Sequence, residues 1–177
     1  AAIPYLRADA ARRTQAAAEI ARVAGGVTPA PPRLLAVGLC WTGAPGNAYN
    51  RRRAVSLQAL APLLAVPGIR WFSLQREGEA IARDDEAPAM RLAALPMRND
   101  LDGTAALVAA LDLVVSVDTS IAHLAGALGK PVSILLPFAA DWRWLEARAD
   151  SPWYPTARLY RQRTPGDWAA PVAELGL

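Results

Sequence analysis

The sequence predicts an α/β domain with a doubly wound, mostly parallel, Rossmann-like sheet and helices on both faces. Apolar runs and helical segments alternate five or more times along the chain, and the connections between them are short. The run at 111–117 (LDLVVSV) is too short for a core helix and rich in β-branched residues, which indicates a strand covered on both faces. Neither a GxGxxG nor a Walker motif occurs, so the sequence lacks the main evidence for a dinucleotide dehydrogenase or a P-loop enzyme.

The chain divides at a proline-rich segment near its start. Residues 8–24 (ADAARRTQAAAEIARVA) predict an Ala-rich helix that ends at two glycines, and residues 28–32 (TPAPP) exclude both helix and central strand. We therefore expect a helix and linker over residues 1–32 and a Rossmann-like domain over residues 33–177.

The second part contains six predicted strands and four predicted helices. The strands are expected at residues 34–41, 69–75, 91–95, 113–117, 131–136 and 157–160. The helices are expected at residues 56–66, 103–111, 120–128 and 167–175. Ser56 is the expected N-cap of the first of these helices, and Gly129 follows the third at the position where glycine commonly ends a helix. Polar loops are expected at residues 42–53 and 76–88, the second of which includes a short helical turn.

Composition narrows the class of protein. With 53% apolar and 20% charged residues, the chain is expected to fold rather than to remain disordered. The net charge of +3 is weak evidence for a polyanionic partner, so we expect no nucleic acid. Eighteen of the 19 basic residues are arginine, which suits phosphate recognition but is explained equally well by a GC-rich genome. Only the cluster Arg51–Arg53 is treated as informative.

The same data suggest a compartment. Cys40 is the only cysteine, so no internal disulfide can form, and a reducing compartment is favoured. No apolar run reaches the length of a membrane span, and residues 1–10 lack the features of a signal peptide. We therefore expect a cytoplasmic protein without a membrane span. The abrupt opening AAIPYLRAD is typical of the middle of a longer protein.

A first candidate site follows the strand at 113–117. Asp118, Thr119 and Ser120 stand at the carboxyl end of this strand and the start of a helix, where ligands bind and phosphate is favoured. We expect Thr119 and Ser120 to contact phosphate, and Asp118 to cap the helix or accept from sugar hydroxyls. His123 lies opposite the apolar stripe of that helix, beside two small residues that would allow a ligand to approach. The alternative is a solvent-exposed surface histidine.

A second candidate is the polar loop at 42–53, which contributes Gly43 and Asn47 to the predicted site. Loops after the first and fourth strands of a doubly wound sheet are neighbours at its switch point. This places the cluster Arg51–Arg53 near Thr119, as a clamp for a diphosphate leaving group. The alternative is a solvated basic loop.

Further candidates lie in and beyond the remaining strands. Asp141 and Trp142 belong to a Trp-rich segment at 138–156, whose aromatic side chains suit stacking on a sugar or base. Core packing or a face for a partner domain would explain the tryptophans equally well. Gln75 and Met97 lie just beyond the second and third strands, within reach of a nucleotide. With one histidine and one cysteine, no metal and no bound cofactor are expected.

Three stretches together resemble a known family. They are VGLCWTGAPGNAYNRRRAVSLQALAPLL, SVDTSIAHLAGALGKPVSILLPFAADWRWL and SPWYPTARLYRQ. They are similar to the C-terminal half of bacterial GT-B glycosyltransferases, in particular to tetratricopeptide-repeat-linked proteins related to glycosyltransferase family nine, which includes the lipopolysaccharide heptosyltransferases. The resemblance implies an inverting, metal-independent transferase with two Rossmann-like domains and the active site between them. By this resemblance, residues 33–177 would be the Rossmann-like nucleotide-sugar-binding domain, which holds the donor. A missing N-terminal domain, placed before the helix and linker at residues 1–32, would hold the acceptor and usually the base.

The resemblance also implies roles for particular residues. Asp118, Thr119 and His123 match the donor-binding positions, and Arg52 or Arg53 matches the basic residue that stabilises the departing diphosphate. Because the acceptor half is absent, we expect this chain alone to bind a nucleotide sugar or nucleotide diphosphate weakly and to transfer little or nothing.

Two other interpretations remain open at this stage. One is a non-catalytic interaction module with a decayed nucleotide pocket. Such a module would bind another domain or a second copy of itself through its Trp-rich face, or through the exposed cleft face that a missing acceptor domain would leave uncovered. The other is an unrelated Rossmann-like nucleotide binder.

Overall fold

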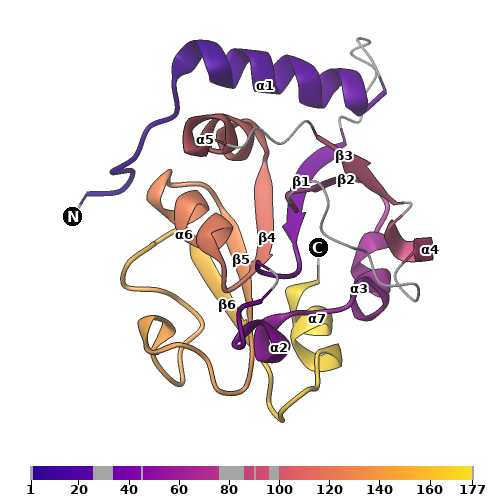
Figure 1. The fold of residues 1–177 in the computed structure, drawn as a ribbon, viewed down its shortest axis with the longest axis vertical. Coiled ribbons are helices and arrows are strands. Elements are labelled where there is room, and N and C mark those ends of the chain that lie inside the picture. Colours follow the sequence, from indigo (N-terminus) through magenta and orange to yellow (C-terminus); the bar gives the residue numbers. More distant parts are fainter. Residues whose placement is uncertain are drawn as a thin grey trace.

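The computed structural model describes residues 2–25, 34–44, 46–75, 86–89, 91–95 and 100–176. These residues form one six-stranded parallel sheet in the order β3-β2-β1-β4-β5-β6 (Figure 1). The strands are β1 (Leu35–Cys40), β2 (Ile69–Ser73), β3 (Leu92–Ala94), β4 (Leu113–Val117), β5 (Val132–Leu136) and β6 (Ala157–Arg161). The predicted Rossmann-like sheet is confirmed, and β4 occupies the predicted residues.

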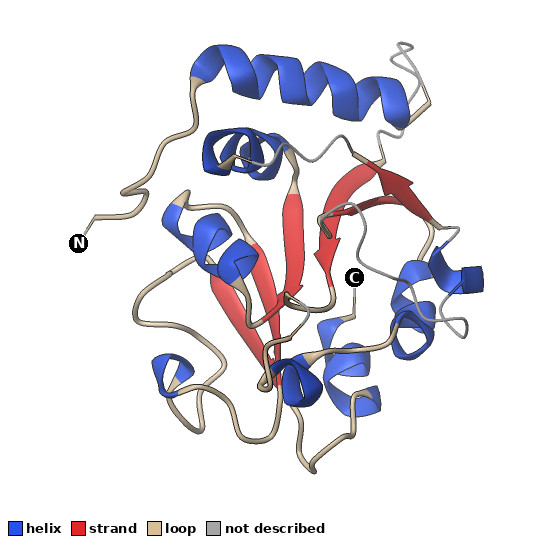
Figure 2. Cartoon of the chain, viewed as in Figure 1, coloured by secondary structure: helices blue, strands red, loops and turns tan. Residues whose placement is uncertain are grey.

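The helices lie on both sides of this sheet (Figure 2). They are α1 (Ala10–Val23), α2 (Asn50–Arg53), α3 (Leu57–Leu64), α4 (Glu86–Ala89), α5 (Leu101–Ala110), α6 (Ser120–Ala127) and α7 (Ala169–Leu175), with a 3₁₀ turn at Trp142–Trp144. On one face, α5 and α6 pack on the sheet and α1 packs against α5. On the other face lie α3 and α7. Strand β4 is therefore buried on both sides, with Val114 in one core and Val115 in the other.

The strand order creates a switch point between β1 and β4. Strands are added on one side of β1 in the first half of the chain and on the other side after β4. The two central strands pair in parallel from Val37 with Leu113 to Cys40 with Ser116. The loops that leave β1 and β4 consequently start next to each other at the carboxyl edge of the sheet, where ligands bind in folds of this kind.

Predicted helix ends have the expected geometry. The Ala59 N–H donates to Ser56 Oγ at 3.1 Å, so Ser56 caps α3. Gly129 has a φ of +70°, and the N–H of Lys130 donates to the carbonyl of Ala125 at 2.9 Å, which closes the end of α6. One element was not predicted: α2 forms within the polar loop at 42–53. The Pro-rich segment at 28–32 and most of the loop at 76–88 lie outside the described residues.

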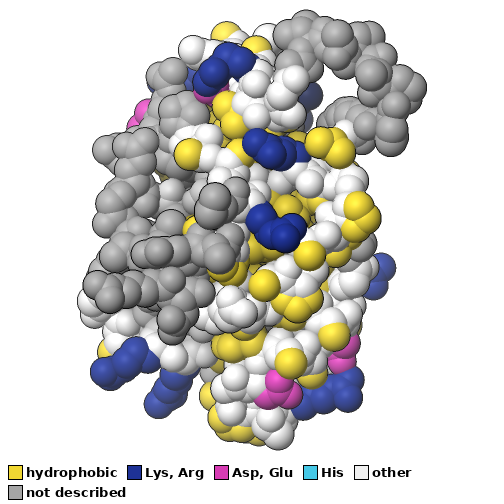
Figure 3. Space-filling view, turned by 90° about the vertical axis from the view of Figure 1, so that its right-hand side faces the viewer, with side chains coloured by type: hydrophobic (Ala, Val, Ile, Leu, Met, Phe, Trp, Pro, Cys, Tyr) yellow, Lys and Arg dark blue, Asp and Glu magenta, His cyan; other side chains and the backbone are white. Residues whose placement is uncertain are grey.

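The tryptophans divide between core and surface. Trp41, Trp71 and Trp144 are buried, whereas Trp142 and Trp153 are exposed, so core packing explains only part of the set. On the side that carries α3 and α4, hydrophobic and basic side chains are interspersed (Figure 3). Among the described residues, the structure has no helix long and apolar enough to cross a membrane.

Candidate functional site at the switch point

The loops after β1 and β4 meet through an arginine. Arg53, the last residue of α2, donates from Nη1 to the main-chain carbonyl oxygen of Asp118. Its guanidinium carbon lies 5.6 Å from the centre of the Tyr49 ring, and Arg53 Nε donates to Asn50 Oδ1 at 3.4 Å. The predicted proximity of the arginine cluster to the start of α6 is therefore present in the structure, through Arg53.

Asn50 and Gly43 shape the loop around this arginine. Asn50 Oδ1 accepts from the Gly43 N–H at 2.7 Å, and Asn50 Nδ2 donates to Thr42 Oγ1 at 2.8 Å. A Cβ added to Gly43 would lie 2.2 Å from Nη2 of Arg53, so a side chain here would displace the guanidinium from its present position. Gly43 therefore makes a close contact with Arg53 of the same loop. Asn50 was not predicted, although asparagine is typical of loops that bond their own backbone.

The other two arginines of the cluster lie elsewhere. Arg51 and Arg52 are exposed, and with Ala48 and Tyr49 they line an open hollow beside α2. Asn47 is also exposed, and its Oδ1 accepts from the Tyr49 N–H at 2.9 Å, which stabilises the turn before α2. The cluster therefore separates into one cation at the switch point and two on the surface.

At the start of α6, the two hydroxyl side chains differ in direction. Thr119 is buried, and its Oγ1 shares a hydrogen bond with Ser116 Oγ at 3.0 Å and lies 3.6 Å from Cys40 Sγ. Ser120 is exposed. Thr119 thus ties α6 to β4 and β1 through its side chain, and Ser120 faces solvent at the helix N-terminus.

His123 is half-buried in a cage of three groups. Its ring stacks on Trp144, with centroids 4.9 Å apart and planes 18° apart. Nδ1 shares a hydrogen bond with Tyr154 Oη at 3.0 Å, and Nε2 lies 3.7 Å from Oδ1 of Asp118. The His123 side chain is 34% exposed and that of Asp118 only 10%. The alternative of a free surface histidine is therefore wrong.

The small residues beside His123 have a different use from the one expected. A Cβ on Gly126 would lie 2.3 Å from Cγ of Tyr154, so the missing side chain makes room for this tyrosine. Gly126 and Ala127 are buried, as is the apolar stripe on the opposite side of α6. The expectation that these residues admit a ligand is corrected: the ring of Tyr154, from the same chain, occupies that space.

The segment after β5 extends along the same edge. Asp141 Oδ1 accepts from the Arg143 N–H at 3.0 Å and from its Nη1 at 2.7 Å, which closes the 3₁₀ turn. Trp142 is 68% exposed, with the Arg143 guanidinium carbon 5.1 Å from its ring centre. Tyr49 Oη donates to the carbonyl of Ala139 at 3.2 Å, linking this segment to the loop after β1.

Of the two residues predicted to reach a nucleotide from beyond β2 and β3, the structure describes Gln75 but not Met97. Gln75 is buried, and its Oε1 accepts from the N–H groups of Trp41 and Thr42 at 3.0 and 3.2 Å. This carbonyl joins the end of β2 to the end of β1. Met97 lies outside the described residues.

Burial and charge shift several pKa values here. Burial lowers the pKa of His123 below its ordinary value, while the carboxylate of Asp118 opposes that shift. Burial and the hydrogen bond with Tyr5 raise the pKa of Tyr154. Burial and the charge of Asp118 raise the pKa of Tyr49. Burial alone would raise the pKa of Asp141, but the hydrogen bonds from Arg143 together outweigh burial and lower this pKa. The lowered pKa favours the neutral form of the His123 imidazole, which lies beside the Asp118 carboxylate.

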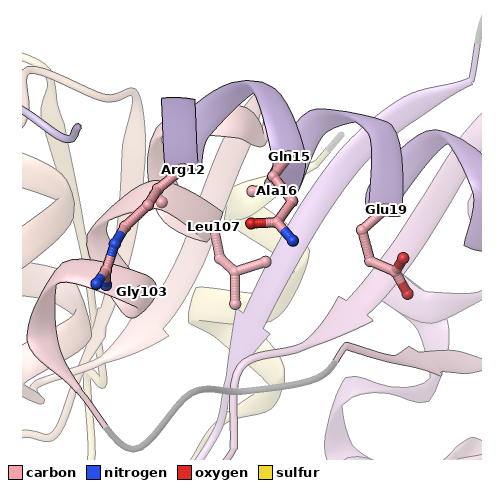
Figure 4. A pocket seen from close by; sticks show the side chains of 7 residues that line it. Arg12, Gln15, Ala16, Glu19, Gly103 and Leu107 are labelled. Carbon is pink, nitrogen blue, oxygen red and sulfur yellow. The ribbon is translucent and has the colours of Figure 1, made fainter. Parts of the chain in front are cut away.

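A second hollow lies between α1 and α5 (Figure 4). Its walls include Arg12, Gln15, Glu19 and Leu107, and none of the residues of the switch-point site lines it. Within the described ranges, no group of three or more His, Cys, Asp or Glu side chains is placed to hold a metal ion.

Fold and site together define a Rossmann-like domain whose switch point combines a helix N-terminus, a buried carboxylate and an arginine. The sequence profile of glycosyltransferase family 9 (heptosyltransferase) matches residues 58–135, which include β4, most of α3 and all of α6. This part of the chain is therefore similar to family 9 glycosyltransferases.

The chain is also similar to individual proteins and solved structures. Protein FlbA of Caulobacter vibrioides is 32% identical over 137 residues, covering 75% of this chain and 23% of FlbA. The E. coli ADP-heptose lipopolysaccharide heptosyltransferase II has the same fold, with a TM-score of 0.61 and 17% identity over 97% of this chain and 52% of the enzyme. A family 9 glycosyl transferase of Veillonella parvula gives a TM-score of 0.53 and 14% identity over 97% and 46%. The chain thus spans about half of each solved relative and about a quarter of FlbA.

Proposed function

We propose that this chain is the donor-binding part of a glycosyltransferase that uses a nucleotide sugar. The observation that carries the proposal is the position of Arg53, whose guanidinium reaches the Asp118 carbonyl at the start of α6. The family 9 profile match over residues 58–135 supports the same class of activity. In this proposal the diphosphate of the donor lies between Arg53 and the N-terminus of α6.

The chemistry follows from the charges at this point. In glycosyl transfer, an acceptor oxygen forms a bond to the anomeric carbon, and the bond from that carbon to the diphosphate oxygen breaks. Negative charge then accumulates on the departing diphosphate. Arg53 supplies a fixed positive charge, and the first N–H groups of α6 have no partners within the helix, so both stabilise that charge. Thr119 holds the helix N-terminus against β4 and β1.

Asp118 and His123 suit the uncharged part of the donor. A buried carboxylate repels phosphate but accepts hydrogen bonds from hydroxyl groups. We assign these two residues to sugar or ribose hydroxyls. Gly43, Asn50 and Tyr49 then act indirectly, because they hold the Arg53 guanidinium in place.

The parent protein is proposed to be an inverting, metal-independent transferase with a second domain that supplies acceptor and base. FlbA and both solved relatives are longer than this chain, which supports such a domain. By itself the chain is expected to bind a donor without transferring the sugar. We also propose that the protein is cytoplasmic, because its proposed substrate, a nucleotide sugar, is a cytoplasmic metabolite.

The test is calorimetric titration of the chain with ADP, UDP, GDP, CDP and dTDP. ADP comes first because the E. coli relative is named for ADP-heptose. Saturable binding of one nucleotide that is lost in Arg53→Ala and kept in Arg51→Ala supports the site. Binding that both variants retain equally would place the nucleotide elsewhere and overturn the proposal.

One observation favours a second candidate, an interaction module. Phe138, Trp142 and Trp153 are exposed on the segments that follow β5. If these side chains bind a second copy, the chain sediments as a dimer and no nucleotide binds. Trp142→Ala would then dissociate the dimer, whereas a donor-binding domain would remain monomeric in both forms.

A further inference from the structure

We infer that Tyr154 is a positioning residue that holds His123 in the tautomer with its hydrogen on Nε2. In that form His123 presents an N–H donor beside the Asp118 carboxylate, and together the two groups bind a hydroxyl of the donor. The role in donor binding rests on the proposed function, whereas the tautomer is a property of the chain without ligand.

The geometry fixes the imidazole on three sides. Trp144 is fully buried and stacks on one face of the ring, which restricts its tilt. Tyr154 Oη meets Nδ1 at 3.0 Å, and Asp118 Oδ1 faces Nε2 at 3.7 Å. The two ring nitrogens therefore meet chemically different partners, a phenol and a carboxylate.

These partners select the tautomer. An ionised carboxylate only accepts hydrogen bonds, so a lone pair on Nε2 would face the negative charge of Asp118. A hydrogen on Nε2 replaces this repulsion with attraction. Nδ1 is then an acceptor, and the phenol of Tyr154 can donate to it, because a phenol is both donor and acceptor.

Tyr5 also bonds to Tyr154. Burial and the hydrogen bond between the two phenols raise the pKa of Tyr154. The Tyr5 N–H donates to the carbonyl of Ala127 at 3.1 Å, which holds the N-terminal segment along α6. With hydrogen on Nε2, the order of donation is Tyr154 to His123 and His123 toward Asp118.

The contact between helix and tyrosine depends on Gly126. Any side chain at this position would meet the Tyr154 ring, with a Cβ only 2.3 Å from Cγ. Glycine inside a helix is less favourable than alanine, yet this glycine stands one turn after His123. The ring of Tyr154 can approach the imidazole only because of it.

The spacing on the other side leaves room for a ligand atom. At 3.7 Å, Nε2 and Oδ1 are farther apart than in a normal hydrogen bond. A hydroxyl oxygen can accept from Nε2–H and donate its own hydrogen to the carboxylate. A phosphate oxygen cannot donate in this way and is repelled by Asp118, so the pair discriminates in favour of a hydroxyl.

Because His123 is the only histidine in the sequence, its ring nitrogens give an unambiguous ¹⁵N NMR signature. We expect the unliganded chain at neutral pH to show hydrogen on Nε2 and an unprotonated Nδ1. In Tyr154→Phe, which keeps the ring, the two tautomers should mix. The matched control is Tyr160→Phe, which removes a phenol oxygen on the opposite side of the sheet and should leave the spectrum unchanged. Hydrogen on Nδ1 in the wild type, or an unaltered tautomer in Tyr154→Phe, would overturn the inference.

Affinity separates this inference from the proposed function. If a nucleotide or nucleotide sugar binds, Tyr154→Phe should weaken it between about twofold and tenfold, as expected for one misaligned hydrogen bond. If none binds the wild type, the proposed function fails, and the spectra still decide the tautomer. Binding of a donor with unchanged affinity in Tyr154→Phe would refute the link between the tautomer and the donor.

Discussion

Arg53 donates a hydrogen bond to the main-chain carbonyl oxygen of Asp118, across the point where the strand order of the sheet reverses. Through this bond, the loop after β1 contacts the start of the helix after β4. A cation placed there also offsets the negative end of the Asp118 carbonyl dipole. The same guanidinium, held by Tyr49 and Asn50, remains beside the helix N-terminus as a fixed positive charge.

Removal of this cation should affect nucleotide binding far more than removal of its neighbours. Arg53→Ala is expected to weaken diphosphate binding by about tenfold or more, because a charge-assisted hydrogen bond contributes about 1.5–3 kcal/mol. Arg53→Lys should recover only part of the loss, since lysine lacks the planar fork. Calorimetric titration of each variant measures the effect.

The controls are Arg51→Ala and Arg52→Ala, whose side chains are exposed. Each should change affinity less than about threefold, because exposed charges are screened by salt. Equal losses for all three arginines would show that the cluster acts only through its overall charge.

Gly126→Ala should destabilise the protein although alanine favours helix. The gain in helix propensity is about 0.5–1 kcal/mol, whereas the clash with the Tyr154 ring costs about 1–3 kcal/mol. We expect a net loss, measured as the free energy of unfolding in urea. In a Tyr154→Ala background the obstacle is gone, so the same substitution should be neutral or stabilising. Equal costs in both backgrounds would exclude the proposed contact.

Ser56→Ala should cost about 1 kcal/mol of stability, because Ser56 accepts from the Ala59 N–H at the start of α3. Ser56→Asp retains an acceptor and should be close to wild type. Ser120→Ala, at an exposed first position of α6, serves as the matched control and should change stability by less than about 0.5 kcal/mol. Urea denaturation of the four proteins is the measurement, and a cost at Ser120 as large as at Ser56 would contradict the capping argument.

The sheet could be predicted from sequence because its signals are local. The residues of β4 form an apolar run bounded by polar residues, and Gly129 closes α6 at the predicted position. The meeting of the loops after β1 and β4 then follows from the strand order alone. Which of the three arginines lies there could not be predicted, because α2 forms from polar residues without periodicity and its direction depends on Asn50.

The surroundings of His123 could not be predicted for a related reason. Trp144 and Tyr154 lie far along the chain, in a segment whose only helical element among the described residues is a single 3₁₀ turn. Tertiary bonds fix their positions: Trp153 Nε1 donates to the Arg143 carbonyl at 2.7 Å, and Arg161 Nη2 to that of Trp144 at 2.5 Å. The only local signal was the glycine at 126, which indicates a close approach but not the residue that approaches.

His123 should make stability fall as the pH falls below neutrality. Burial lowers its pKa in the folded chain below the ordinary 6.5, despite the opposing charges of Asp118 and Asp141, and Arg143 adds to the lowering. Between the folded pKa and 6.5 the unfolded chain therefore binds more protons, and stability must rise with pH through that window. For one group the slope cannot exceed about 1.4 kcal/mol per pH unit.

The measurement is the free energy of unfolding in urea between about pH 5 and pH 7.5, where histidine is the side chain that ordinarily titrates. His123→Gln should lose most of the slope seen in the wild type. Asp118→Asn removes the carboxylate that favours the protonated imidazole, so the slope should extend to lower pH. Tyr154 also faces the ring, but its raised pKa keeps the phenol neutral throughout this range. An identical slope in the wild type and His123→Gln would mean that the imidazole titrates alike in folded and unfolded chains, and the caged neutral histidine would have to be abandoned.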